Sequence, residues 1–184
     1  MRSLSSKMLA GALAKAAVFG CLTMRTAAQT LAVPSAPVMV DIPDAHEMPD
    51  PSLDYKIVFD MQTVGATAGD ISPGLKMIGT LINTYEKHGV APDHLHLQAV
   101  FHGETILLVV DDATYKARTG FAHNPNAELL EQLSKAGLKL VVCGQSAMQR
   151  HYDFKSILPL AQINLSASVT FINLAARGYT RMTD

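Results

Sequence analysis

Cys143 and His102 are the two side chains whose types and positions in this sequence favour chemistry. Cys143 lies in VVCGQS, where an apolar run gives way to a small-residue turn, and His102 follows another apolar run in VFHG. A solvent-accessible thiolate is a nucleophile that can carry a second sulfur atom as a persulfide, and a neighbouring imidazole can accept the thiol proton or stabilise the thiolate. Backbone N–H groups of a following helix would favour the anionic sulfur. We therefore predict a reactive cysteine.

Both residues also have structural explanations. Free cysteine is among the most buried residue types, so Cys143 is either reactive or simply packed at the end of a hydrophobic strand. The sequence holds seven histidines, and His102 is either the partner of the cysteine or one surface histidine among several. Gly144 favours the functional alternative, because glycine lets a ligand approach the backbone closely. Arg150 either faces the site or complements the end of a short helix. The predicted binding groups around the cysteine are Gly103, Gly144, Gln145, Ser146 and Arg150.

A metal site is a further alternative, because His94 and His96 stand two apart and would point to one face of a strand, as would His102. Neutral imidazoles are ligands for copper or zinc. However, this spacing along a strand exceeds one coordination sphere, and an edge strand with exposed polar residues explains the pattern. We predict neither a metal ion nor another cofactor.

The elements that would position these residues alternate between strands and capped helices from residue 55 onwards. Strands are predicted at 55–61, 94–101, 138–142, 163–167 and 179–182, and helices at 73–88, 112–118, 124–136, 145–150 and 168–177. The run ILLVV at 106–110 is ambiguous between strand and buried helix. This alternation predicts a parallel sheet with helices on both faces. Ligands of such sheets collect at the carboxyl ends of the strands, where Cys143 and His102 are expected.

Residues 1–28 predict an export signal. They contain four basic residues and no acidic one. The short apolar stretch AAVFGCLTM lies between Lys15 and Arg25, and small residues follow up to Ala28. Cleavage there would give a periplasmic or secreted protein with Cys143 as its single thiol, and therefore without an internal disulfide. The apolar stretch is too short for a membrane-spanning anchor. Lipid attachment at Cys21 and an amphipathic start that stays in the cytosol are the alternatives.

Residues 29–54 hold five of the nine prolines and five acidic residues, and they show neither helical nor strand periodicity. This composition predicts a solvated linker or arm before a domain at 55–184. Residues 29–184 carry 11 basic against 16 acidic side chains, a formal charge of −5, without a basic cluster. Nucleic acid is therefore excluded as a partner.

Several segments together resemble the DsrE/DsrF-like family. They are FHG at 101–103, Asp112 with Tyr115, NPNAELLEQLSKAGLKLVVCGQS at 124–146, and LSASVTFINLAARGY at 165–179. The resemblance runs from about Tyr55 to the last residue and is most specific around CGQS. It implies a three-layer α/β/α sandwich with a mostly parallel sheet of about five strands, assembled into homotrimers or homohexamers. It also implies a sulfur-relay role, with the persulfide-carrying cysteine at Cys143 and the family's histidine–glycine pair at His102 and Gly103.

The leading functional hypothesis is an exported, homo-oligomeric protein in which Cys143 carries or transfers sulfane sulfur, with a donor or acceptor protein as partner. Intracellular members of the family differ, because they work in complexes of several subunit types. No second subunit type is apparent from this sequence. A cysteine-dependent hydrolase or transferase is a second hypothesis, although the sequence offers no clear acid to orient His102. A binding or assembly module with a structural cysteine is the third.

Overall fold

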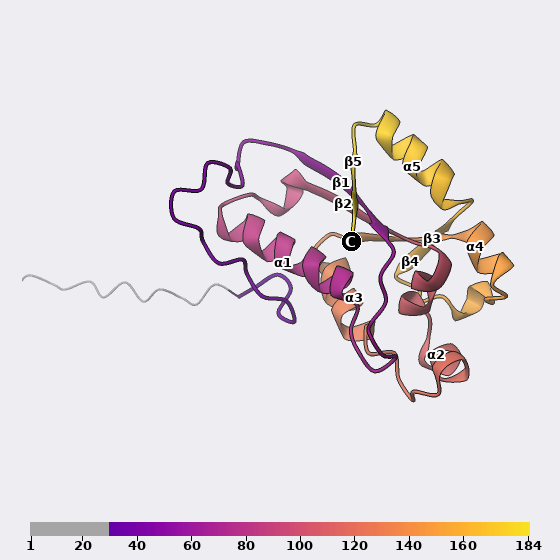
Figure 1. The fold of residues 1–184 in the computed structure, drawn as a ribbon. Coiled ribbons are helices and arrows are strands. Elements are labelled where there is room, and N and C mark those ends of the chain that lie inside the picture. The colour runs from indigo at the N-terminus through magenta and orange to yellow at the C-terminus, as the bar shows by residue number, and fades with distance from the viewer. Residues whose placement is uncertain (1–29) are drawn as a thin grey trace, which may run out of the picture.

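A five-stranded parallel sheet organises residues 30–184, the part of the chain that the computed structural model describes (Figure 1). The strand order is β4-β3-β2-β1-β5, and each neighbouring pair is parallel. The strands are β1 (Tyr55–Met61), β2 (Leu95–Phe101), β3 (Lys139–Cys143), β4 (Ala161–Asn164) and β5 (Thr180–Thr183). Their carboxyl ends therefore meet at one edge of the sheet. The predicted strands are confirmed, except that the one expected at 163–167 begins and ends earlier, as β4.

Five α-helices and three 3₁₀ helices connect the strands within the described residues. The α-helices are α1 (Pro73–Lys87), α2 (Asp112–Thr119), α3 (Ala127–Lys135), α4 (Gly144–Gln149) and α5 (Ala167–Ala176), and the 3₁₀ helices are η1 (Pro92–His94), η2 (Gly103–Val109) and η3 (Phe154–Ser156). The ambiguous run at 106–110 lies mostly in η2, where buried Ile106, Leu108 and Val109 join the core.

The start of α1 follows from its first residues. The Ser72 hydroxyl accepts a hydrogen bond from the N–H of Leu75 at 3.5 Å, and Pro73 occupies the first helical position, as the sequence predicts. Leu75, Ile78 and Ile82 recur at helical spacing and are fully buried. This apolar stripe fixes α1 against the sheet.

The two faces of the sheet are covered unequally (Figure 1). The larger core lies on the face of α1 and α3, and it includes Phe59, Phe101 and Leu130. On the opposite face, Leu174 of α5 packs against Val58, Val100 and Val141 in a small separate cluster. The predicted three-layer α/β/α sandwich is thereby confirmed.

The segment before the sheet is irregular, but its beginning is not the solvated arm that the prolines predicted. Val33 is fully buried and Ala36 nearly so, and both lie against Gly79 of α1, where an added Cβ would come within 2.6 Å of the Ala36 methyl. The Asn83 side chain accepts from the N–H of Val33 and donates to the carbonyls of Val33 and Ala36, each at 2.9 Å. The side-chain amide of Asn83 on α1 therefore supplies the hydrogen bonds of these buried backbone groups, in a segment whose composition predicted exposure to solvent.

Replacing Asn83 with alanine is expected to lower the free energy of unfolding by about 2 kcal/mol, because buried backbone groups of Val33 and Ala36 lose their partner. Urea titration measures this change, and limited proteolysis should cut residues 30–54 faster in the variant. Thr80→Ala, on the same helix, is the matched control and should stay within about 0.5 kcal/mol of the parent. Equal stability of both variants would contradict the docking role of Asn83.

The edge strand β5 is short and mostly exposed. It pairs with β1 from Ile57↔Thr180 to Asp60↔Thr183. Beyond it, the Asp184 carboxylate accepts from the N–H of Gln62 at 2.6 Å and from the hydroxyl of Thr63 at 2.7 Å. These bonds fasten the end of β5 to the turn that follows β1.

The predicted export signal at residues 1–28 and the alternative lipid site at Cys21 lie outside the described residues and stay predictions. Among helices in the described part of the chain, none has the length and hydrophobicity needed to cross a membrane.

Candidate functional site

Cys143 is the last residue of β3 and the N-cap of α4, so it lies at the predicted edge of the sheet. Its Sγ accepts a hydrogen bond from the N–H of Ser146 at 3.4 Å, and the Ser146 hydroxyl accepts one from the N–H of Gly103 at 2.8 Å. Ser146 thereby ties together the turns that follow β2 and β3. The cysteine is buried, with 5% of its surface exposed, in contrast to the solvent-accessible thiol expected from the sequence.

Not all backbone N–H groups of the turn after Cys143 bind the sulfur atom. The N–H of Gln145 donates to the carbonyl of Leu165 at 3.2 Å. Gly144 is pressed against β4, where an added Cβ would lie 2.8 Å from the Asn164 carbonyl oxygen. Of the predicted binding residues Gly144, Gln145 and Ser146, which follow the cysteine, Ser146 is the one whose N–H bonds to the thiol in the described contacts.

Gly144→Ala is expected to lower the free energy of unfolding by about 2 kcal/mol, because the methyl group would push β4 away from α4. Thermal or urea unfolding measures the change. Gln145→Ala keeps the backbone bond to Leu165 and removes an exposed side chain, so it should be nearly neutral. A Gly144→Ala protein as stable as its parent would mean that β4 can shift to accommodate the added methyl group without loss of unfolding free energy.

His102 follows β2 and is paired with a residue that sequence reasoning missed. Its Nε2 lies 2.6 Å from Oδ1 of Asp60, a fully buried carboxylate on β1. The signal was present in the sequence, because Asp60 is the one acidic residue within the apolar strand YKIVFDM. Charged residues are almost never fully buried unless they are paired, so a partner from another strand was to be expected.

Two further side chains bind the second oxygen of Asp60. The Arg181 guanidinium from β5 pairs with Oδ2, and the Gln62 amide donates to it at 3.0 Å. Arg181 also stacks on the ring of Phe171, with its guanidinium carbon 4.1 Å from the ring centre. Burial raises the pKa of Asp60, but hydrogen bonds from Arg181, His102 and Gln62 outweigh it and hold the pKa below the usual 3.8. Asp60 is therefore anionic at neutral pH and can orient the His102 ring.

The sheet brings His102 and Cys143 to neighbouring positions on one face. Val142 pairs with Phe101, so Cys143 and His102 are the next residues along adjacent chains. Strand alternation places both on the side of α5, and the His102 ring lies edge-on to Phe171 at 6.4 Å between centres. The Nε2 atom of His102 is directed to Asp60, and no hydrogen bond joins His102 to Cys143 among the described contacts.

The family model of DsrE/DsrF-like proteins matches residues 54–183. The chain belongs to the DsrE/DsrF-like family. Among solved structures, the domain is similar to MTH1491, a protein of unknown function from Methanobacterium thermoautotrophicum, with a TM-score of 0.51 and 12% identity. The match covers 71% of this chain and all of that one, and at this identity it shows the fold alone. No curated protein matches. The predicted family is thereby confirmed, and it indicates a role related to sulfur relay.

The remaining predicted side chain, Arg150, makes no hydrogen bond or ion pair with Cys143, His102 or Asp60 among the described contacts. Arg150 pairs with Glu104 of η2, with 2.6 Å between Nη1 and Oε1. The histidines weighed as metal ligands do not converge either. His94 ends η1 before the strand begins, and His96 lies 3.7 Å from Asp54. The chemistry of the site therefore depends on Cys143 and on the His102–Asp60 pair.

Proposed function

We propose that this DsrE/DsrF-like protein accepts a sulfane sulfur atom on Cys143 and passes it on as a persulfide. The observation that supports it best is the His102–Asp60 hydrogen bond of 2.6 Å at the strand position beside the cysteine. A buried carboxylate that orients an imidazole next to a thiol is the arrangement of an activated nucleophile. The family adds its sulfur-relay character.

The proposed transfer balances without an oxidant. The Cys143 thiolate attacks the outer sulfur of a persulfide or polysulfide donor, a new S–S bond forms, and the donor thiolate leaves with the electron pair of the broken bond. His102 accepts the Cys143 proton before the attack and returns it to the leaving thiolate. Asp60 binds Nε2, so Nδ1 is the nitrogen that exchanges this proton in the proposed step.

A cavity near Cys143, which the cysteine itself does not line, is the place from which a donor would approach in the proposed step. This cavity of about 450 Å³ lies between β3, β4 and α5, and it is lined by Asn164, the register partner of Cys143. Lys139, four residues before Cys143 at the start of β3, and Arg177, at the end of α5, line the part of the cavity that lies away from Cys143. Because Cys143 is only 5% exposed, the proposed transfer requires β4 or α4 to move aside when the donor arrives.

The test is exposure of the protein to inorganic polysulfide, followed by peptide mass spectrometry. We expect the peptide that contains Cys143 to gain sulfur atoms that a thiol reductant removes, and Cys143→Ser to gain none. Circular dichroism in the same samples shows whether the protein is folded. A folded protein whose Cys143 peptide gains no sulfur would rule out the carrier role.

A cysteine-dependent hydrolase is the second candidate, because Asp60 supplies the acid that sequence analysis did not find. An activated ester or thioester should then leave an acyl group on Cys143. The persulfide proposal is preferred for its agreement with the family.

We also propose that the protein is exported and assembles into a homotrimer or homohexamer. The composition of residues 1–28 supports export. Four exposed apolar side chains on and around β4 and α5 support association, namely Ile163, Leu165, Val169 and Ile172. Amino-terminal sequencing of the secreted protein and sedimentation in solution test these two points.

A further inference from the structure

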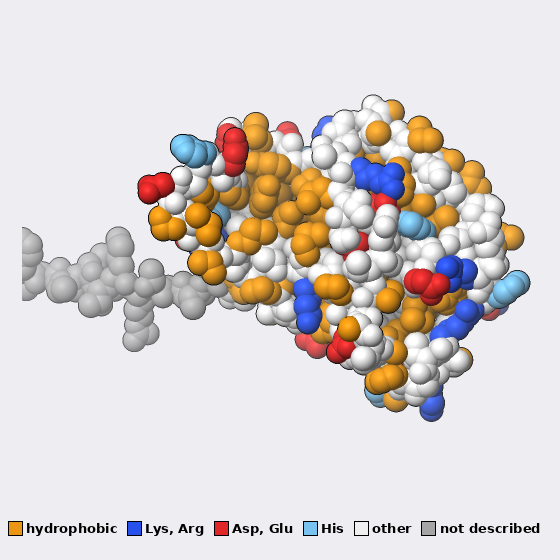
Figure 2. Space-filling view, viewed as in Figure 1, with side chains coloured by type: hydrophobic (Ala, Val, Ile, Leu, Met, Phe, Trp, Pro, Cys, Tyr) orange, Lys and Arg blue, Asp and Glu red, His pale blue; other side chains and the backbone are white. Residues whose placement is uncertain are grey.

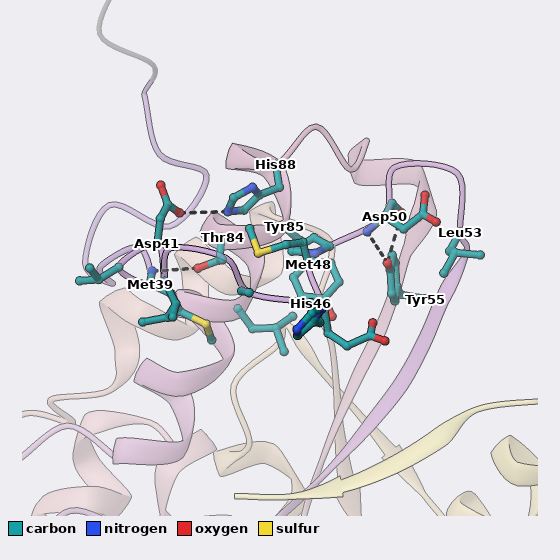
Figure 3. A pocket seen from close by; sticks show the side chains of 16 residues that line it. Met39, Asp41, His46, Met48, Asp50, Leu53, Tyr55, Thr84, Tyr85 and His88 are labelled. Carbon is teal, nitrogen blue, oxygen red and sulfur yellow. Dashed lines mark hydrogen bonds and ion pairs between the residues drawn. The ribbon is translucent and has the colours of Figure 1, made fainter.

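A second cavity lies at the opposite edge of the sheet from Cys143. It has a volume of about 740 Å³ and opens between residues 39–53 and the carboxyl-terminal half of α1 (Figure 3). Tyr55, Leu81 and Tyr85 line it, and the two tyrosine rings meet edge to face at 4.7 Å. Tyr55 begins β1, whereas Cys143 ends β3, so this cavity is independent of the proposed sulfur site.

The walls of the cavity are fastened to the domain. The N–H of Met39 donates to the Thr84 hydroxyl at 3.0 Å. At the other end, the Tyr55 hydroxyl accepts from the N–H of Asp50 at 2.8 Å and donates to its carbonyl (Figure 3). The cavity is therefore formed without a ligand, which lowers the entropy lost on binding.

Hydrophobic side chains are concentrated here. Five of the 13 large hydrophobic side chains that are exposed in the described residues come from this segment, namely Met39, Val40, Ile42, Met48 and Leu53. Figure 2 shows hydrophobic side chains gathered on this side of the molecule. A contiguous apolar surface of this kind marks a binding site more often than an isolated exposed residue does.

The charge around the cavity is negative. Residues 30–54 contain five acidic residues and neither lysine nor arginine. Asp41, Glu47 and Asp50 line the cavity. Lys87 and His88 bind Asp41, and Ser52 binds Asp50. Glu47 makes no hydrogen bond or ion pair within the described residues, so its charge is available to a ligand.

We infer that this cavity binds an amphiphilic cation, with its hydrocarbon chain against Leu81 and the tyrosines and its ammonium group beside Glu47. The apolar lining favours burial of an alkyl chain. Carboxylates and the face of an aromatic ring both attract a cation, and the same carboxylates repel an anionic amphiphile of equal length. Charge, rather than hydrophobicity alone, therefore selects the ligand.

The test compares decyltrimethylammonium with decyl sulfate by isothermal titration of the intact protein, below the critical micelle concentrations. We expect one ammonium ion per chain, bound about tenfold or more tightly than the sulfate. Glu47→Gln should weaken ammonium binding several-fold. Asp44→Asn, which removes a carboxylate of the same segment outside the cavity, should leave it unchanged.

Three results would overturn the inference. Equal affinity for the two amphiphiles would show that charge does not select. Equal weakening by Asp44→Asn and Glu47→Gln would show a general electrostatic attraction rather than a site. Self-association through this face, seen by sedimentation without one-to-one binding of the ammonium ion, would assign the surface to a second copy of the chain instead.

Discussion

Arg181→Gln is expected to lower the free energy of unfolding by about 3 kcal/mol at neutral pH, because it leaves the fully buried Asp60 without its cationic partner. The remaining bonds from His102 and Gln62 do not supply a full positive charge at the second oxygen. Urea unfolding measures the loss. Arg177→Gln removes an exposed charge from the end of α5 and should change stability by less than about 0.5 kcal/mol.

The effect of Arg181→Gln should depend on pH. In the parent protein the folded pKa of Asp60 lies below its usual value, so its stabilising contribution is present above that value and lost as the pH falls through the folded pKa. In the variant, the folded pKa of Asp60 should be higher than in the parent, because the Arg181 guanidinium no longer opposes the effect of burial. The difference between parent and variant should therefore be largest at neutral pH and shrink as the pH falls through the folded pKa of Asp60 in the variant and then in the parent. A pH-independent difference would point to lost packing on Phe171 instead.

His102→Gln is expected to slow sulfur uptake by Cys143 about 100-fold, since removal of a general base commonly costs about two to four orders of magnitude. Glutamine can still donate to Asp60, so the fold should persist. The measurement is the initial rate of persulfide formation at fixed polysulfide, in samples whose unfolding transitions coincide with that of the parent. This prediction depends on the proposed function.

His96→Gln provides the matched control, because His96 lies at the amino end of β2 beside Asp54 and away from Cys143. It should leave the rate unchanged. A His102→Gln protein that takes up sulfur within about twofold of the parent rate would remove His102 from the proton transfer and leave it as a structural partner of Asp60.

Much of the fold could be predicted from the sequence, because local signals agree with the global arrangement. Ser72 and Pro73 mark the start of α1, and Asp111 caps α2 by accepting from the N–H of Thr114 at 2.7 Å. The strand predicted at 163–167 was misplaced because Ile163 and Leu165 alternate with polar residues in INLSA, which is a strand pattern. In the structure Ser166 is the N-cap of α5, so the chain has already left the sheet there.

The candidate site was only half predictable. Cys143 and His102 each follow an apolar run, so their location at the carboxyl ends of two strands could be predicted from local sequence. Two partners of Asp60, His102 and Arg181, lie 42 and 121 residues away along the chain, and only the strand order brings them together. The burial of Cys143 likewise depends on β4, whose backbone approaches Gly144. Contacts of this kind leave no local pattern.

The contacts that hold β5 against β1 have a consequence for aggregation. Arg181 binds Asp60 of β1, and Asp184 binds the turn that follows β1. If these bonds are lost, the short β5 can separate from β1 before the rest of the sheet unfolds. The bared edge of β1 would then offer unpaired peptide groups as a template for a foreign strand. The Arg181–Asp60 ion pair and the hydrogen bonds of the Asp184 carboxylate therefore keep this edge of β1 covered.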